Sequence, residues 1–127
     1  MGYTHYFTQK GETPNEQDWQ GIKLRARSIL QRHIDIVCRE YDSMSEFPLI
    51  DDDCIMFNGM ADEGHEAFFI AKDQKGFSFC KTAQKPYDEV VVKILKMVQS
   101  ECPGWLELSS DGDINDGPKV FGSSEQL

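Results

Sequence analysis

The stretch F-S-F-C-K-T-A-Q-K-P-Y-D-E-V-V, residues 77–91, decides the fold, because it passes from a strand pattern into a helix pattern within a few residues. Residues 77–80 alternate between phenylalanine and smaller side chains, and such alternation predicts a β-strand. Pro86 then suits the first turn of a helix, where a backbone N–H would be unpaired in any case. The stretch therefore predicts a strand that leads directly into a helix.

Two helices are predicted from apolar residues that recur at helical spacing. The second follows Pro86 and ends at Pro103-Gly104; its buried residues are Tyr87, Val90, Val91, Ile94, Leu95, Val98 and Cys102. The first begins at residues 13–16, T-P-N-E, which have the form of a capping box with Thr13 as the cap. Its apolar stripe is Trp19, Ile22, Ala26, Ile29, Leu30, His33 and Val37. We expect this helix to run to about Arg39 or Tyr41.

Alternating residues predict further strands at 2–8, 54–58, 66–71 and 105–109. In the first of these, Tyr3, His5 and Phe7 share one face, and Thr4, Tyr6 and Thr8 share the other. A polar turn at residues 72–76 joins the strand at 66–71 to a strand at 77–81. Three strands in a row therefore lie between the two helices, which is typical of an antiparallel arrangement.

The element order is β-α-β-β-(β)-α-β, in which the bracketed strand is residues 77–81. We expect one α+β domain over residues 1–127, with two helices on one face of a mostly antiparallel sheet of about four to five strands. Without the bracketed strand this is the ferredoxin-like order. The other sheet face carries aromatic residues and is a candidate surface for homo-oligomer formation. A segment rich in Gly, Ser and Asp follows from about Asp111.

The charge of the chain limits its partners. Lys and Arg number 13 against 22 Asp and Glu, which gives a net charge of −9. Binding to nucleic acid usually rests on neutralising phosphates with Lys and Arg, so we expect no direct nucleic-acid binding. The acidity has two interpretations. The more common is solubility, and the other is that an acidic face imitates nucleic acid and occupies a basic groove on a partner.

The cysteines and the apolar runs indicate a compartment. Cys38, Cys54, Cys80 and Cys102 include no C-x-x-C pair and match no zinc spacing, so we expect reduced thiols in a cytosolic protein. Cys38 and Cys102 fall on predicted helical positions as small core residues. The N-terminus has no apolar signal region, and no apolar run reaches the ~20 residues of a membrane span. We expect a cytosolic protein without a membrane partner.

The junction of strand and helix is the strongest candidate for a binding site. A helix N-terminus presents unpaired N–H groups and a partial positive charge, and anions bind there. Two lysines and a threonine add charge and a hydroxyl, and Tyr87 can stack on a ring. The candidate ligand-binding residues are Lys81, Thr82, Lys85, Tyr87, Asp88, His5 and Tyr3. The alternative is that the lysines are merely solvated, while Asp88 and Glu89 already complement the helix dipole.

Other motifs are weaker. Asp62, His65 and Glu66 are metal-ligand types, but their spacing matches no metal motif, and a polar loop is the more common case. Residues 111–117, D-G-D-I-N-D-G, fail the EF-hand pattern and favour a turn. No Ser or Cys stands in a nucleophile motif, so no triad is predicted. Cys80 beside Lys81 suggests a lowered thiol pKa, on weak support. We expect no metal, no cofactor and no catalytic residue.

Several segments carry a resemblance to known proteins. They are G-Y-T-H-Y-F at 2–7, F-N-G at 57–59, H-E-A-F-F at 65–69, F-C-K-T-A-Q-K-P-Y-D at 79–88 and S-S-D-G at 109–112. Together they resemble a family of small uncharacterised bacteriophage and prophage proteins, some of which also occur in other bacteria. Gln84 stands where Arg is expected in such relatives, which argues against a strongly basic pocket. The resemblance implies a phage-related origin and a host-cytoplasm setting, and it implies no reaction.

These observations favour a small phage or prophage accessory protein that binds and does not catalyse. Its target is either a host defence-related protein, which the overall charge favours, or a small anionic ligand such as a nucleotide, which the local Lys-Thr-Lys cluster favours. A nucleotide-processing or small-metabolite enzyme is an alternative, with His5, His65 or Asp88 as general base. A virion or assembly component is a further alternative.

Overall fold

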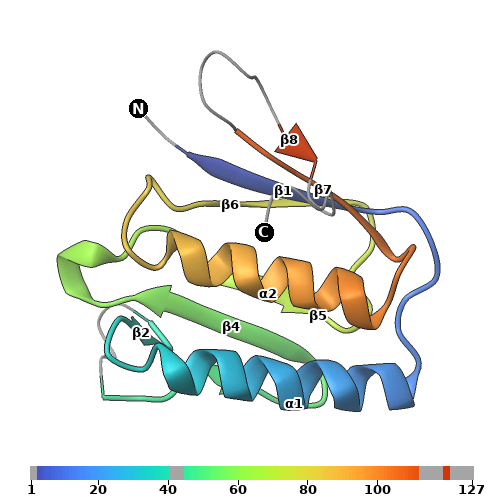
Figure 1. Cartoon of the computed structure of the whole chain (residues 1–127), viewed down its shortest axis with the longest axis horizontal. Coiled ribbons are helices and arrows are strands. Elements are labelled where there is room, and N and C mark those ends of the chain that lie inside the picture. The colour runs from blue at the N-terminus through green and yellow to red at the C-terminus, as the bar shows by residue number, and fades with distance from the viewer. Residues whose placement is uncertain (1–2, 41–44, 112–118, 121–127) are drawn as a thin grey trace.

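The computed structural model describes residues 3–40, 45–111 and 119–120, and it has an α+β fold with antiparallel sheets (Figure 1). Its elements, in chain order, are β1 (Thr4–Gln9), α1 (Glu16–Arg32), β2 (Val37–Cys38), β3 (Leu49–Ile50), β4 (Cys54–Gly59), a 3₁₀ turn (Ala61–Glu63), β5 (Phe68–Ala71), β6 (Phe77–Lys81), α2 (Asp88–Glu101), β7 (Leu106–Ser110) and β8 (Lys119–Val120). The predicted fold class is confirmed. Most of the predicted Gly-, Ser- and Asp-rich segment, including D-G-D-I-N-D-G after Asp111, lies outside the described residues.

The first sheet has the strand order β6-β1-β7-β8, with β1 between β6 and β7 (Figure 1). Tyr6 on β1 lies opposite Phe79 on β6 and opposite Ser109 on β7. The strand predicted at 77–81 is thus present, and it pairs with the N-terminal strand. On its other side β1 pairs with β7, which pairs with β8, so the two ends of the described chain lie in one sheet.

The second sheet is organised around β4, which pairs with β2, β3 and β5. The strands therefore form two hydrogen-bonded sheets where one was expected, and a continuous ferredoxin-like sheet is not observed. Glu66, just before β5, marks the division. Its N–H donates to the Lys81 carbonyl at 3.1 Å, and its side-chain Oε1 accepts from the Lys81 N–H at 2.8 Å. A side chain thus takes the place that a backbone carbonyl would have in a continued ladder.

Helix α1 differs from the prediction at both ends. Asn15 is the cap, because its Oδ1 accepts a hydrogen bond from the Asp18 N–H at 2.7 Å, and Thr13 is not. The helix ends at Arg32, so the expected extension to Arg39 or Tyr41 was wrong.

The residues that follow α1 form β2, which pairs with Asn58 and Gly59 of β4. Val37 and Cys38 are buried as predicted, but on a strand and not on a helix. Backbone pairing with β4 therefore outweighs the helical periodicity of this segment.

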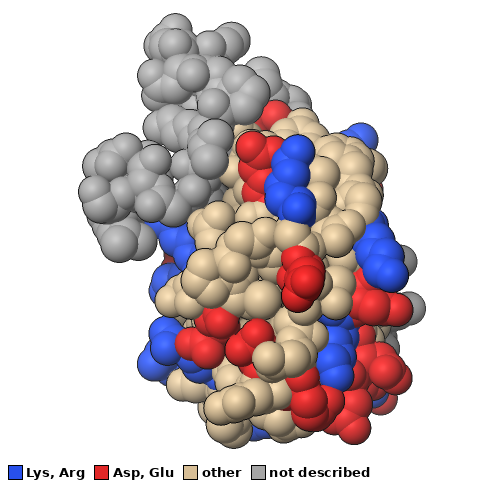
Figure 2. All heavy atoms as spheres, turned by 90° about the vertical axis from the view of Figure 1, so that its right-hand side faces the viewer, with Lys and Arg blue, Asp and Glu red and all other residues tan. Residues whose placement is uncertain are grey.

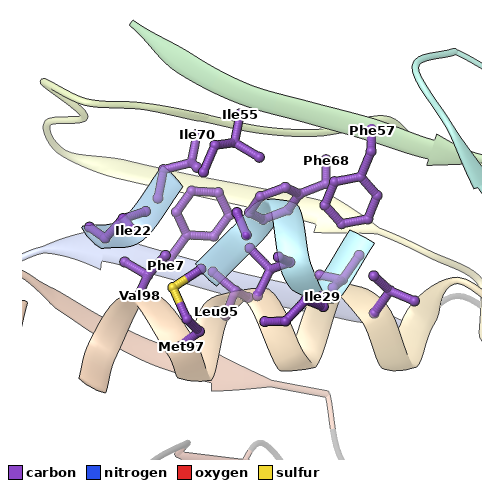
Figure 3. Packing of buried hydrophobic residues seen from close by; sticks show 14 of the residues in the cluster. Phe7, Ile22, Ile29, Ile55, Phe57, Phe68, Ile70, Leu95, Met97 and Val98 are labelled. Carbon is purple, nitrogen blue, oxygen red and sulfur yellow. The ribbon is translucent and has the colours of Figure 1, made fainter. Parts of the chain in front are cut away.

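The core lies among the helices and the inner faces of the sheets. Helices α1 and α2 pack against each other, and Figure 3 shows their side chains meeting those of β1, β4 and β5. Phe68 is central to this core: its ring centroid lies 5.7 Å from that of Phe7 and 5.2 Å from that of Phe57. All three side chains are fully buried. Burial of apolar surface on this scale is the main stabilising term for a domain of this size.

The two faces of the first sheet differ in their surroundings. His5 and Phe7 on β1 point inward and are fully buried. Tyr6 points to the opposite face, where Phe77 and Phe79 of β6 are 60% and 44% exposed. The polar cluster and the exposed aromatic residues therefore occupy opposite faces of the same strands.

Candidate functional site

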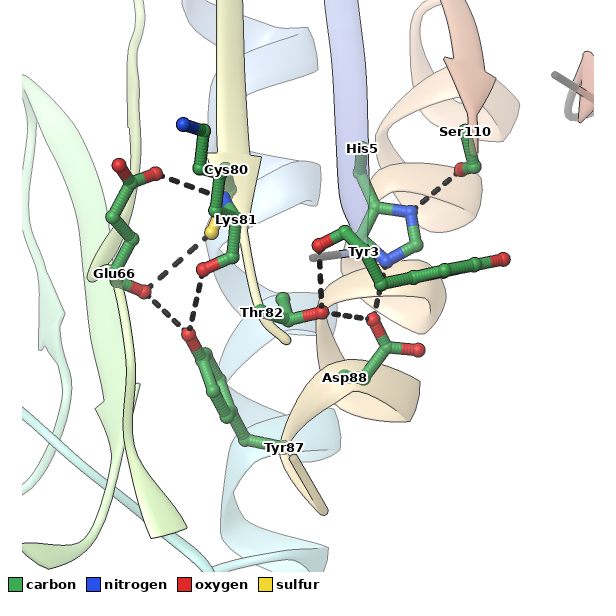
Figure 4. Close-up of polar contacts among 9 residues, drawn as sticks. All are labelled: Tyr3, His5, Glu66, Cys80, Lys81, Thr82, Tyr87, Asp88 and Ser110. Atoms are coloured by element: carbon green, nitrogen blue, oxygen red, sulfur yellow. Dashed lines mark hydrogen bonds and ion pairs between the residues drawn. The ribbon is translucent and has the colours of Figure 1, made fainter. Parts of the chain in front are cut away.

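The structure brings together part of the predicted site at one end of the first sheet. Tyr3, His5, Thr82 and Asp88 lie close together there, and Ser110 at the end of β7 joins them (Figure 4). After Lys81 the chain turns sharply through Ala83 and Gln84, whose φ angles are 54° and 58°. The Thr82 N–H donates to the Tyr3 carbonyl at 2.8 Å, which anchors this turn to β1.

His5 is the centre of this polar cluster. Its Nε2 lies 2.6 Å from Asp88 Oδ1, and its Nδ1 lies 2.6 Å from Ser110 Oγ. Because a carboxylate only accepts hydrogen bonds, Nε2 donates to Asp88. Thr82 donates its hydroxyl hydrogen to the same carboxylate oxygen. The cluster therefore links β1, β7, the turn after β6 and the start of α2.

Asp88 is the first residue of α2, so its carboxylate lies at the positive end of the helix dipole. Glu89 adds a second acidic side chain in the first turn. The chain itself thus supplies the negative charge that the prediction assigned to a bound anion. The candidate site at this helix N-terminus is occupied by the protein's own side chains.

Tyr87 was predicted to stack on a ligand, and the structure places it elsewhere. The residue is fully buried, and its hydroxyl donates to the Glu66 carbonyl at 2.6 Å. Burial raises the pKa of this phenol well above its ordinary value, and the nearby Cys80, Glu66 and Asp88 raise it further. Tyr87 is a core residue that joins α2 to the segment before β5.

The two lysines also separate from the cluster. Lys81 is exposed, and its Nζ lies 5.8 Å from the centre of the Phe79 ring on the outward face of the first sheet. Lys85 is half-buried in the turn before α2, where its N–H donates to the Thr82 carbonyl at 3.0 Å. The predicted site is therefore divided into a buried polar cluster, a core tyrosine and two separate lysines.

Tyr3 borders the cluster on its exposed side. Its ring meets that of His5 edge to face, with centroids 5.1 Å apart and planes at 78°. Partial burial raises the pKa of the Tyr3 phenol, and the carboxylates of Asp88 and Asp111 raise it further. The negative field of the two carboxylates reaches this edge of the molecule and disfavours a further anion there.

Ser110 was not predicted as a site residue. Ser110 and His5 lie 105 residues apart in sequence, and only the pairing of β1 with β7 places them opposite each other. The S-S-D-G segment drew attention to this region through the family resemblance. Its pairing with the N-terminal strand, however, depends on sheet register, which local sequence does not specify.

The order serine–histidine–aspartate matches that of serine hydrolases, but the two ring nitrogens are exchanged, since Nδ1 faces the serine here and Nε2 faces the aspartate. A nucleophile must be reached by substrate, however, and Ser110 is 1% exposed while His5 is 0% exposed. Every polar side chain of the cluster has a partner within the protein. A buried, satisfied network of this kind rigidifies the fold.

The loop that contains Asp62 and His65 is held by Asn58. Asn58 Oδ1 accepts from the Gly59 and His65 N–H groups at 2.7 and 3.1 Å, and so closes the loop that contains Asp62. Among the described residues, no three His, Cys, Asp or Glu side chains are grouped so that they could hold a metal ion. The suggestion that Lys81 lowers the thiol pKa of Cys80 was wrong: burial, with Glu66 and Asp88 nearby, raises it to about 12.

Comparison of the chain with protein-family models, with curated proteins and with solved structures gives no significant match. In the part of the chain that the structure describes, neither helix is long and apolar enough to span a bilayer. The function must therefore be inferred from the surfaces and contacts of this chain alone.

Proposed function

We propose that this protein binds a partner and does not catalyse a reaction, and that its binding surface is the outward face of the first sheet. The main observation that supports this proposal is the contrast between the two faces of β1 and β6. The reactive groups of the inner face are buried and hydrogen-bonded, whereas Phe77 and Phe79 on the outer face are 60% and 44% exposed. Large apolar side chains gathered in the open are typical of interaction sites.

The resemblance to phage and prophage proteins supports an accessory role in a host cytoplasm. Two kinds of target remain in that setting: a host defence-related protein and a small anionic ligand such as a nucleotide. An inhibitor that imitates nucleic acid needs a continuous acidic face. Figure 2 shows one face of the molecule on which acidic and basic side chains are interspersed. The placement of Lys81 beside Phe79 favours the ligand over the mimic.

Native mass spectrometry tests the proposal on protein purified gently from a bacterial host. We expect wild type to retain additional mass that denaturation removes, and the double variant Phe77→Ala/Phe79→Ala to lose it. The matched control is Phe69→Ala, which removes a 48% exposed phenylalanine from β5 in the second sheet. Equal retention by wild type and the double variant would show that the outward face is not the binding surface.

If wild type carries no additional mass, a pull-down from host lysate with the same three proteins decides between the targets. A host protein that wild type and Phe69→Ala recover, and the double variant does not, would support a protein partner at the same face. Equal recovery by all three would contradict the proposed surface.

Hydrolysis is a second candidate function, and the hydrogen-bond chain from Ser110 through His5 to Asp88 is the observation that favours it. An activity-based fluorophosphonate probe tests it directly, with Ser110→Ala as the control. Because Ser110 is 1% exposed, we expect no labelling of the folded protein. If the probe labels wild type and does not label Ser110→Ala, the protein is a hydrolase instead.

A further inference from the structure

The outward face of the first sheet carries three neighbouring aromatic rings on two paired strands. Tyr6 of β1 lies opposite Phe79 of β6 in the register, and Phe77 follows on the same face of β6. The centroids of Tyr6 and Phe77 lie 5.9 Å apart with planes at 25°, and those of Phe77 and Phe79 lie 5.9 Å apart with planes at 46°. We call these three residues the aromatic face. Phe77 and Phe79 are 60% and 44% exposed, so both rings can be reached from solvent.

Two carboxylates near the aromatic face have partners, and only Glu107 of the two is paired with a positive charge. Glu107 of β7 pairs with Lys10, with 3.4 Å between Oε1 and Nζ. Asp111, just after β7, accepts a hydrogen bond from the Tyr6 hydroxyl at 2.9 Å. This last bond holds the Tyr6 ring in place on the sheet. It also raises the pKa of the Tyr6 phenol.

Two lysines bracket β6 in the sequence. Lys75 lies just before the strand, and Lys81 is its last residue, with Nζ 5.8 Å from the Phe79 ring centre. Both residues are exposed. Among the residues that the structure describes, neither lysine forms an ion pair. The positive charge beside the rings is therefore available to an anionic partner, although the whole chain is acidic.

The sequence of this strand has a form that recurs in sheets that bind RNA. Residues 75–79 read K-G-F-S-F, which resembles the pattern Lys or Arg, Gly, aromatic, Gly or Ala, Phe of the base-stacking strand in such sheets, with Ser78 in place of Gly or Ala. In those sheets aromatic side chains on two adjacent strands stack on unpaired bases, while the helices cover the other face. Here the aromatic residues stand on the adjacent strands β1 and β6, and the helices lie on the inner side.

We propose that the aromatic face binds the unpaired bases of a short single-stranded nucleic acid, with Lys75 and Lys81 approaching its phosphates. This inference rests on the proposed function and names the ligand of the same surface. Flat rings and flanking ammonium groups complement bases joined by phosphates.

The net charge of −9 argues against binding that depends on many phosphate contacts. The proposed binding depends mainly on the stacking of bases on aromatic rings. Binding driven by phosphate contacts needs many cations, whereas base stacking on aromatic side chains needs exposed rings. Two lysines predict a shallow dependence on salt, with a slope of log K against log salt of roughly −1.4, from about −0.7 per phosphate. Duplexes, whose bases are already stacked and paired, are predicted not to bind.

Fluorescence anisotropy with labelled oligothymidylate and oligouridylate of about eight nucleotides tests the inference. Unlabelled duplex of the same length and free thymidine monophosphate serve as competitors. We expect saturable binding by wild type, a loss of at least tenfold in affinity for Phe77→Ala/Phe79→Ala, and an unchanged affinity for Phe69→Ala. Lys81→Ala should weaken binding and flatten the salt dependence. Circular dichroism checks that the variants fold. We expect them to fold because both phenylalanines are exposed.

The outcomes separate this inference from the proposed function. If wild type binds neither oligonucleotide, or binds both as tightly after the double substitution, the nucleic-acid inference is overturned. Competition by the monophosphate as strong as that by unlabelled oligonucleotide would also overturn it, because the ligand would then be a free nucleotide. In each case a partner lost by the same double variant in mass spectrometry or pull-down would leave the binding face established.

Discussion

His5 Nε2 lies 2.6 Å from the Asp88 carboxylate, although 83 positions separate the two residues in sequence. The contact joins the N-terminal strand to the first turn of α2, and His5 is fully buried. A charge-assisted hydrogen bond in such surroundings is among the stronger polar contacts that a protein makes. It makes His5 and Asp88 the first residues to test for stability.

Asp88→Asn is expected to lower the free energy of unfolding by about 1–3 kcal/mol, because it weakens the bonds to His5 and Thr82 in a buried cluster. His5→Ala should cost at least as much, and the double variant should lose less than the sum of the two single variants. Urea denaturation measures all three. The control is Glu89→Gln, an exposed acidic residue of the same turn. Additive losses for His5 and Asp88 would show that the contact is not energetically coupled.

Gly59→Ala is expected to destabilise the fold by about 1–3 kcal/mol through overpacking. A Cβ at this position would lie 2.4 Å from the Glu63 carbonyl oxygen and 2.9 Å from Tyr87 Cδ1. The matched control is Gly21→Ala on α1, where the nearest atom is the mobile end of the Glu101 side chain at 2.9 Å. Alanine favours helix there, so thermal melting should show no loss. A similar loss at both glycines would contradict the tight approach at Gly59.

Cys80 is expected to resist alkylation in the folded protein, because burial raises its thiol pKa to about 12. Its ordinary pKa is about 8.5. The neutral thiol therefore stabilises the fold fully below about pH 8.5, and this contribution is lost as the pH rises from there towards 12. Iodoacetamide labelling followed by peptide mass spectrometry should modify Cys80 only in denaturant. Fast native labelling at pH 8.5 would contradict the burial of this thiol.

Glu66→Ala is expected to loosen the junction between the two sheets. The substitution removes the acceptor of the Lys81 N–H, which lies 2.8 Å from the Glu66 carboxylate. Amide hydrogen exchange at Lys81 should accelerate by at least tenfold, while exchange in the middle of β6 stays slow. Glu63→Ala, which changes an exposed acidic residue nearby, should leave Lys81 unaffected. An unchanged rate at Lys81 in Glu66→Ala would show that the backbone holds the junction without this side chain.

Local sequence patterns predicted most of the helices and strands. They did not predict how the candidate site residues would be arranged. The alternation in residues 77–80 and the apolar stripe after Pro86 predicted β6 and α2, because both depend on neighbours in sequence. The extension of α1 beyond Arg32 was wrong, because β2 gains backbone pairing with β4 that periodicity cannot reveal. The division of the sheet at Glu66 was missed for the same reason. In the sequence, Tyr87 fitted both the buried stripe of the second helix and an exposed ligand-binding position.

The sequence by itself determined the α+β class, the amphipathic helices and the apolar residues of the core, since these follow from short-range periodicity and burial. Only the tertiary structure decided which face of each strand meets which neighbour. That choice buried His5 with Asp88 and Ser110 and left Tyr6, Phe77 and Phe79 on the outside. Side chains alternate along a strand, so a shift of one residue in pairing would exchange the two sets. The register of β1 with β6 and β7 thus separates the buried polar cluster from the face that we propose for binding.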